Sequence, residues 1–381
     1  MSVEIVKKWL AGGKYAKVNG CVVRPVPHPI IKDEPLAIEK GQAVAICLTD
    51  EKGCRWILKQ FRPGRELEID YLRSVRAVLP KKPGLESGTQ RQILSSQQIG
   101  RQSGCFYSSE LANFLNGAIL MPRVEGTDWA GVAHDIRQGT IDPPRQQRVT
   151  LGQKLADLIE ALEAAGCAHR DLASGNVFVD ITSRRIRLID FDSLYQDRLS
   201  RPANTTAGTS GYSAPYAFDG DDLSAEKTWR PYADRYALGL LVVEFCLMDR
   251  NCPVTGDGGM FDQKELCRRQ GRGLATARNA LSRDWPNLVE PFDATIRSRG
   301  FASCPSPKNW HNALSQDALP LAYPGLLTDV STASFEEILA RAAQSKTPTW
   351  PAPTLSSIGG FDDDGADGTF SVTRQPPIPR N

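Results

Sequence analysis

The segment from Cys167 to Asp192, CAHRDLASGNVFVDITSRRIRLIDFD, places the strongest constraint on how this chain can fold. Two short runs of apolar and β-branched side chains flank a polar turn, and this pattern predicts a β-hairpin over residues 177–189. A hairpin of this length holds Asn176 and Asp190 at adjacent strand ends. Asp171 lies a few residues before the first strand, so all three polar side chains are expected to cluster.

This set of side chains fits the transfer of a phosphoryl group. Such a site needs one carboxylate to orient the attacking hydroxyl and two oxygen ligands for a divalent cation. In this interpretation Asp171 is the catalytic carboxylate, and Asn176 and Asp190 are the metal ligands.

The motif His169-Arg170-Asp171-Leu172 with Asn176, followed by Asp190-Phe191, resembles the catalytic loop and metal motif of the eukaryotic-like protein kinases, here of the bacterial type. The resemblance implies an α+β, two-lobed fold with a small antiparallel-sheet N-lobe and a mostly helical C-lobe. It also implies ATP and Mg²⁺ as cofactors, with Mn²⁺ as an alternative metal. The resemblance places the activation segment at residues 193–215, and Arg170 would bind a phosphorylated residue of this segment.

The resemblance covers about residues 36–314 of the 381 and suggests how the chain is divided. The predicted parts are an N-terminal extension (1–34), the kinase N-lobe (35–125), the kinase C-lobe (126–318), a C-terminal helical extension (319–345) and a disordered tail (346–381) that is rich in Pro, Gly, Ser, Thr and Asp.

Strand-like patterns over residues 36–38, 44–48 and 55–61 predict three antiparallel strands of the N-lobe. Lys59, near the end of the third strand, either leaves the core face at an exposed strand edge or binds an anion, and the resemblance implies the nucleotide phosphates as that anion. Helical spacing over residues 65–79 then predicts the regulatory helix, in which Glu68 would pair with Lys59. Glu66 is the alternative partner, and a solvated acidic first turn is the other interpretation.

Two segments compete for the phosphate-binding loop. The stretch beginning at Gly12-Gly13 is richer in glycine, but Gly41 lies in the hairpin directly before Lys59 and is favoured for that reason. Residues 80–110 are polar and are expected to form an insertion. The resemblance implies three kinds of contact with the adenine ring. Met121 would be the gatekeeper, and Pro122 and Val124 would offer backbone groups of the hinge. Apolar side chains from both lobes, Val44, Ile57 and Phe178, would surround the ring.

The C-lobe is predicted from two helices. Leucines at helical spacing indicate an amphipathic helix over residues 147–165, and an all-apolar run predicts a buried helix over residues 234–246. The resemblance gives Asp234 the task of bonding the backbone of the catalytic loop. Tyr216 and Cys304 replace a Glu and an Arg that pair in the family, and the loss of both partners together is compatible with a stable fold.

Composition limits the remaining function classes. The formal net charge is +2, which provides no field suited to nucleic acid or a membrane surface. Nine cysteines without a CxxC pair indicate reduced core residues. With no signal-peptide-like segment, a cytoplasmic protein is expected.

The sequence therefore predicts a protein kinase that modifies Ser or Thr rather than Tyr and phosphorylates itself. A narrower resemblance, to bacterial kinases of tellurite-resistance clusters, adds a phosphatase and a von Willebrand-type protein as partners. Two alternatives stay open. The phosphate-binding loop has a single glycine, Gly41, and Asp192 stands in place of the usual glycine; both features are compatible with a pseudokinase. The second acid in Asp190-Phe191-Asp192 is compatible with a small-molecule phosphotransferase.

Overall fold

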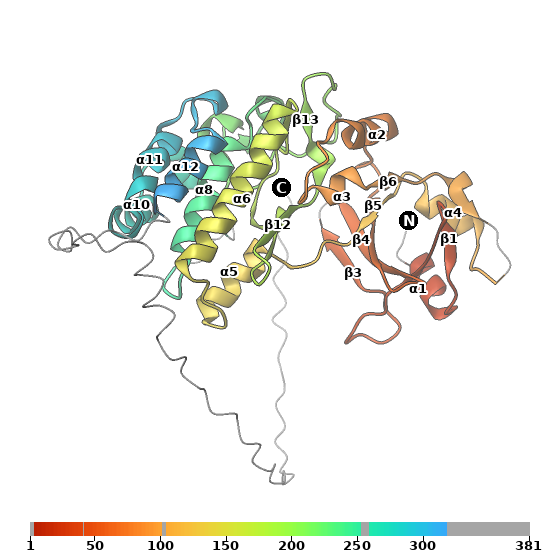
Figure 1. Cartoon of the computed structure of the whole chain (residues 1–381). Coiled ribbons are helices and arrows are strands. Elements are labelled where there is room, and N and C mark those ends of the chain that lie inside the picture. Colours follow the sequence, from red (N-terminus) through yellow and green to blue (C-terminus); the bar gives the residue numbers. More distant parts are fainter. Residues whose placement is uncertain (1–3, 41, 101–103, 253–258, 318–381) are drawn as a thin grey trace, which may run out of the picture. The chain divides into compact units, whose positions relative to one another are not determined.

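The computed structural model describes residues 4–40, 42–100, 104–252 and 259–317 (Figure 1). The N-terminal part of the chain forms an eight-stranded sheet in the order β6-β8-β5-β4-β2-β1-β7, with β3 also paired to β4. Its strands are β1 (Ala16–Val18), β2 (Cys21–Pro25), β3 (Ala37–Lys40), β4 (Ala43–Asp50), β5 (Arg55–Phe61), β6 (Gln92–Ile93), β7 (Ile99–Gly100) and β8 (Ile119–Pro122). The three strands predicted for the N-lobe are β3, β4 and β5.

The expected N-terminal extension is part of this sheet. β2 pairs with β4 from Val23↔Asp50 to Pro25↔Leu48, and β1 pairs with β2. β2 ends at Pro25, and the Val26 N–H donates to the Cys47 carbonyl at 2.9 Å, so the pairing with β4 continues past the proline. The boundary expected at residue 34 therefore does not separate residues 16–25 from the rest of the sheet.

A hydrophobic core covers the outer face of the sheet. Helices α1 (Glu4–Ala11) and α4 (Ser109–Leu115) pack there against apolar side chains of β4 and β5 such as Ile46 and Leu58. Trp9 is fully buried in this core and stacks on Phe106. The N-terminal residues and the segment before β8 thus build one apolar layer together.

The expected polar insertion over residues 80–110 is also largely structured. It contains α3 (Glu86–Thr89), the strands β6 and β7 and the buried side chains of Leu85 and Leu94. These short elements could not be predicted from the polar sequence, because a single buried side chain in a short element produces no periodic pattern.

The C-terminal lobe is mostly helical and includes a small sheet. Helix α8 (Arg235–Leu247) is buried along nearly its whole length, and α6 (Arg145–Ala164) packs beside it (Figure 1), as the apolar patterns predicted. The helices are α5 (Trp129–Gln138), α6 (Arg145–Ala164), α7 (Ala225–Thr228), α8 (Arg235–Leu247), α9 (Gln263–Arg268), α10 (Arg272–Asp284), α11 (Val289–Arg297) and α12 (Pro307–Asp317), and α2 (Ile69–Val78) belongs to the N-lobe. The remaining strands are β9 (Thr127–Asp128), β10 (Cys167–Ala168), β11 (Val177–Asp180), β12 (Arg185–Leu188), β13 (Tyr195–Gln196), β14 (Phe218–Asp219) and β15 (Asp222–Leu223).

The predicted hairpin is formed by β11 and β12, in register from Val177↔Leu188 to Asp180↔Arg185. The Ile189 N–H donates to the Asn176 carbonyl at 3.1 Å, which closes the open end of the hairpin. An antiparallel-sheet lobe followed by a helical lobe confirms the predicted α+β, two-lobed fold.

Some predictions fall outside the described residues: Gly41, the helical extension at 319–345 and the tail at 346–381. Among the helices of the described ranges, none combines the length and the apolar character that crossing a bilayer requires.

Candidate active site

The catalytic loop, residues 169–176, is fixed from below by Asp234 at the start of α8. The backbone N–H groups of His169 and Arg170 donate to the two Asp234 carboxylate oxygens at 2.6 and 2.7 Å. Asp234 is buried, so this bidentate contact satisfies two amides that water does not reach. The contact predicted for Asp234 is confirmed.

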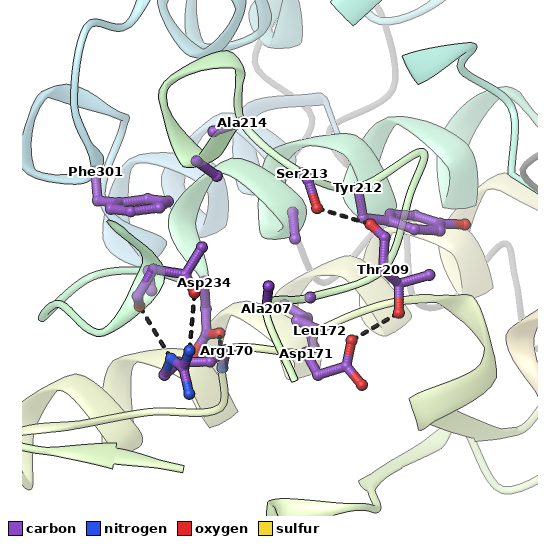
Figure 2. Close-up of a pocket in the computed structure, with 15 residues that line it drawn as sticks. Arg170, Asp171, Leu172, Ala207, Thr209, Tyr212, Ser213, Ala214, Asp234 and Phe301 are labelled. Atoms are coloured by element: carbon purple, nitrogen blue, oxygen red, sulfur yellow. Dashed lines mark hydrogen bonds between the residues drawn. The ribbon is translucent and has the colours of Figure 1, made fainter. Parts of the chain in front are cut away.

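Asp171 is held in place by hydrogen bonds to both of its carboxylate oxygens. Asn176 Nδ2 donates to the Asp171 carbonyl at 2.7 Å and to Asp171 Oδ2 at 3.2 Å. Thr209 Oγ1 donates to Asp171 Oδ1 at 2.6 Å (Figure 2). Thr209 was not predicted as a site residue, although it stands in the Gly208-Thr209 pair that closes the activation segment. The predicted proximity of Asp171 and Asn176 is confirmed.

Beside Asp171 lies a cavity of about 20 Å³ between the catalytic loop, the activation segment (residues 193–215) and α8 (Figure 2). Ala214, Ala237 and Phe301 contribute to its walls. This volume holds about one water molecule, so the cavity is too small to receive a substrate side chain.

Asp190 joins the site from the end of the hairpin. Its backbone is left-handed, with φ 66°, and this turns the side chain toward Lys59 of β5. Lys59 Nζ donates to Asp190 Oδ1 at 2.6 Å. The side chain of Asp190 remains 35% exposed. The structure therefore brings the predicted lysine and the predicted metal ligand into direct contact.

The predicted pairing of Lys59 with Glu68 is wrong. The partners of Lys59 are Asp190 and Asp192, whose Oδ2 lies 2.6 Å from the lysine Nζ. Glu68 is exposed and precedes the first residue of α2, whose buried face is formed by later residues such as Tyr71. The alternative partner, Glu66, is also exposed.

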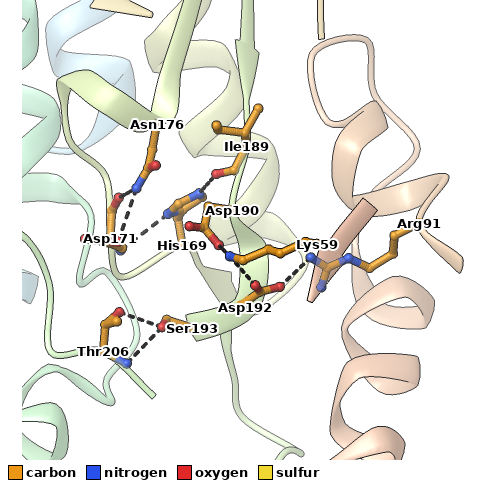
Figure 3. A network of polar contacts seen from close by, with 10 residues as sticks. All are labelled: Lys59, Arg91, His169, Asp171, Asn176, Ile189, Asp190, Asp192, Ser193 and Thr206. Atoms are coloured by element: carbon orange, nitrogen blue, oxygen red, sulfur yellow. Dashed lines mark hydrogen bonds and ion pairs between the residues drawn. The ribbon is translucent and has the colours of Figure 1, made fainter. Parts of the chain in front are cut away.

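Asp192 has a second cation that the sequence did not reveal. Arg91, which lies between α3 and β6, donates from Nη2 to Asp192 Oδ1 at 2.6 Å (Figure 3). The side chains are only 1% and 8% exposed, respectively. Burial favours a raised pKa for Asp192, but Lys59 and Arg91 outweigh it and hold the pKa well below its usual range. Burial would lower the pKa of Lys59, but the carboxylates of Asp190 and Asp192 outweigh this effect and raise it.

Arg170 has partners other than the phosphorylated residue predicted for it, and its binding of such a residue stays a prediction. Its guanidinium is buried and donates to the carbonyls of Thr228, Ser193, Thr206 and Ala225 at 2.9–3.1 Å. Burial lowers its pKa to about 10. Because these carbonyls already surround the cation, a phosphate would have to displace them; the arginine ties the activation segment to α7 directly.

The sheet register decides which predicted adenine contacts share the face of Lys59. Ile57 lies two residues before Lys59 and pairs with Met121, so these three side chains point to the same face. Val44 pairs with Gln60 and packs in the outer core, so its predicted contact with the nucleotide is wrong. A shift of one residue along a strand moves a side chain to the other face.

Ala45 occupies the position expected for Val44, because it is the cross-strand partner of Lys59. Pro122 ends β8, and Val124 follows it half-buried. Phe178 is half-buried in β11, between β9 and β12. The adenine contacts of Pro122, Val124 and Phe178 stay predictions.

The end of the activation segment is anchored in the C-lobe. The Tyr212 hydroxyl donates to the buried carboxyl of Glu244 on α8 at 3.0 Å. Tyr216 Oη lies 3.1 Å from Cys304 Sγ, so the two residues that replace the family's ion pair are in contact. A neutral contact avoids the desolvation that a buried ion pair requires.

Glu244 makes stability depend on pH. Burial raises the pKa of its carboxyl from 4.5 to about 7, although Met260 N–H, Tyr212 and Trp129 donate to it. A carboxyl that binds its proton more tightly in the folded state stabilises the fold at low pH and loses that contribution as pH rises. Between pH ~4.5 and ~7 we expect the free energy of unfolding to fall by about 3 kcal/mol relative to Glu244→Gln. Urea denaturation of both proteins across this range measures the difference; parallel profiles would contradict the prediction.

The fold and the site together define a protein kinase domain: a lysine from a sheet lobe meets two aspartates from a helical lobe, beside a catalytic loop with Asp171 and Asn176. Residues 93–296, more than half of the chain, match the protein kinase domain family. The chain belongs to this family. The match begins after Lys59, in the part of the N-lobe that follows α3.

Relatives are bacterial kinases. The chain is 29% identical over 249 residues to the serine/threonine-protein kinase PknE of Mycobacterium tuberculosis, covering 61% of this chain and 39% of that protein. It is 32% identical over 161 residues to the probable kinase PglW of Streptomyces coelicolor, covering 40% and 9%. A crystal structure of the M. tuberculosis PknI kinase domain covers 78% of this chain and 95% of that chain at 16% identity, with a TM-score of 0.46. The chain thus spans well under half the length of PknE and of PglW.

Proposed function

We propose that this chain is an ATP- and Mg²⁺-dependent protein kinase that transfers the γ-phosphate to serine or threonine hydroxyls and phosphorylates itself. The contact between Asp171 and Thr209 carries the proposal. A threonine hydroxyl on the activation segment already lies 2.6 Å from the carboxylate that would accept the substrate proton. This is the distance at which a general base acts.

The donor set fits a divalent cation and a nucleotide. Both hydrogen bonds from Asn176 to Asp171 use Nδ2, so the Oδ1 atom is the one available as a metal ligand, beside the Asp190 carboxylate. Carboxylate and amide oxygens are the ligands that Mg²⁺ prefers. When bound, the metal would neutralise charge on the phosphates. Lys59 would bind the phosphates, and Asp171 would orient the attacking hydroxyl and take its proton.

The second acid, Asp192, gives little support to a small-molecule phosphotransferase. Its Oδ1 is paired with Arg91 and its Oδ2 with Lys59, so neither oxygen is directed to a metal. The activation segment is also anchored at Tyr212, as expected for a surface that holds a protein substrate.

A map of phosphorylated residues tests the proposed function. The chain is incubated with ATP and Mg²⁺, alone and with a generic protein acceptor, and the products are sequenced by mass spectrometry. We expect phosphoserine and phosphothreonine on both. Absence of incorporation, together with nucleotide-dependent thermal stabilisation, would indicate a pseudokinase, and transfer to aminoglycosides or choline alone would indicate a small-molecule phosphotransferase.

Activity is expected to be independent of phosphorylation in the activation segment, because Arg170 is occupied by backbone carbonyls. Phosphatase-treated enzyme should retain its initial transfer rate within about twofold. The rate is measured from the first turnovers, before new phosphate accumulates, with untreated enzyme as control. A lag that disappears on preincubation with ATP would show that phosphorylation is required.

We infer that the substrates are proteins. The name of the Mycobacterium relative, a serine/threonine-protein kinase, supports the residue type. A phosphatase and a von Willebrand-type protein as partners, and a cytoplasmic location, stay predictions from the sequence.

A further inference from the structure

Four charged side chains form a continuous network at the junction of the two lobes (Figure 3). Lys59 contacts Asp190 and Asp192 at 2.6 Å each, and Arg91 contacts Asp192 at 2.6 Å. The two cations come from the N-lobe, and both aspartates come from one three-residue segment of the C-lobe. The charges balance, so the network is neutral within the protein.

Arg91 depends strongly on Asp192. It is fully buried, and within the described residues its Nε and Nη1 have no hydrogen-bond partner. Its Nη2 contact with Asp192 is therefore its main compensation for the loss of water. Removing one partner of such a pair leaves an uncompensated buried charge. Asp192 and Arg91 consequently fix each other in position.

The two aspartates that contact Lys59 differ in exposure and in their other partners. Asp190 is 35% exposed, and in the proposed function it binds the metal. Asp192 is 8% exposed and is held from its other side by Arg91. Asp192 would thus be the carboxylate that stays paired with the lysine if Asp190 held a cation.

We propose that Asp192, anchored by Arg91, is the positioning residue for Lys59 and takes the place of a glutamate on helix α2. This inference rests on the proposed function. Because Asp192 follows Asp190 by two residues, one segment sets the positions of both the metal ligand and the phosphate-binding lysine. A movement of helix α2 would then not directly break an ion pair of Lys59.

A chemical measurement without ligand tests the network first. Lys59 in the full chain is acylated with a water-soluble amine reagent at several pH values, and its modification rate is followed by mass spectrometry. In the parent, Asp192 Oδ2 lies 2.6 Å from Lys59 Nζ and the lysine side chain is only 15% exposed, so the reagent reaches the amine poorly. In Asp192→Asn, which lacks this ion pair, we expect faster acylation of Lys59 at a fixed pH.

Kinetics then test the positioning role. We expect Asp192→Asn to lower kcat/KM for ATP by about 10²-fold, since a misplaced binding group loses this much. Asp192→Glu, which keeps the charge, should recover part of the loss. Asp70→Asn, an exposed acid on α2, is the matched control and should keep the parent's rate.

A second variant distinguishes loss of Lys59 positioning from misfolding. Asp192→Asn leaves Arg91 buried with a weaker partner, whereas the double variant R91M/D192N removes both charges and is expected to fold. It should show the same fast acylation of Lys59 and the same kinetic loss. Thermal melting measures the folded fraction of each protein.

Two results would overturn the inference: unchanged acylation of Lys59 in the folded Asp192 variants, or a loss in Glu68→Gln equal to that in Asp192→Asn. Failure of the proposed function looks different. In that case the parent itself transfers no phosphate, while the acylation rates still report whether Asp192 holds Lys59.

Discussion

Replacement of Asp171 by asparagine is expected to reduce phosphoryl transfer by about 10²–10⁴-fold, the contribution of a positioned general base. The substitution keeps the size of the side chain and removes the atom that takes the proton. Its partners, Asn176 and Thr209, lie on opposite sides of the carboxylate, so the loop should keep its shape.

Single-turnover transfer from ATP to a protein acceptor measures this loss, and thermal melting checks the fold. Thr209→Ala is the companion variant, because it removes the hydroxyl that holds Asp171 Oδ1 but leaves the base. We expect it to have a smaller effect than Asp171→Asn. An Asp171→Asn protein with the parent's rate would show that Asp171 is not the base.

Replacement of Asp234 by alanine is expected to lower the free energy of unfolding by about 2–6 kcal/mol. Two buried N–H groups, of His169 and Arg170, lose their acceptor, and each unsatisfied group costs about 1–3 kcal/mol. The catalytic loop would also lose its anchor, so transfer should fall together with stability.

Urea denaturation measures the effect on stability. Asp221→Ala, at an exposed acid before β15, is the control and should stay within about 0.5 kcal/mol of the parent. Asp234→Asn retains one carbonyl oxygen and should be affected less than Asp234→Ala. Equal unfolding curves for Asp234→Ala and Asp221→Ala would contradict the anchoring role.

The network around Lys59 separates what is common to the family from what is particular to this chain. Lys59, Asp171 and Asp190 lie in the places that the resemblance predicted. The predicted partner of the lysine, Glu68, does not contact it: Lys59 is paired with Asp190 and Asp192, and Asp192 is also paired with the buried Arg91. Asp192, which suggested a pseudokinase or a small-molecule enzyme, is instead ion-paired with both Lys59 and Arg91.

Local pattern was sufficient for the elements that determine their own structure. The hairpin from Val177 to Leu188 and the buried helix α8 were predicted from alternation and from a continuous apolar run, because those patterns fix which sides of an element are buried. The contact of Asp234 with the catalytic loop followed from the resemblance, since it depends on the motif and not on the inserted segments.

Tertiary structure decided the contacts that cross the two lobes. Val44 and Ala45 differ by one residue, and only the pairing of β4 with β5 shows that Ala45 shares the face of Lys59. Arg91 reaches Asp192 across 101 residues of sequence, from a segment without periodic pattern. The sequence alone determined the two-lobed fold and the clustering of Asp171, Asn176 and Asp190, because short-range patterns encode them. The partners of Lys59 depended on which distant charges the packed lobes bury together.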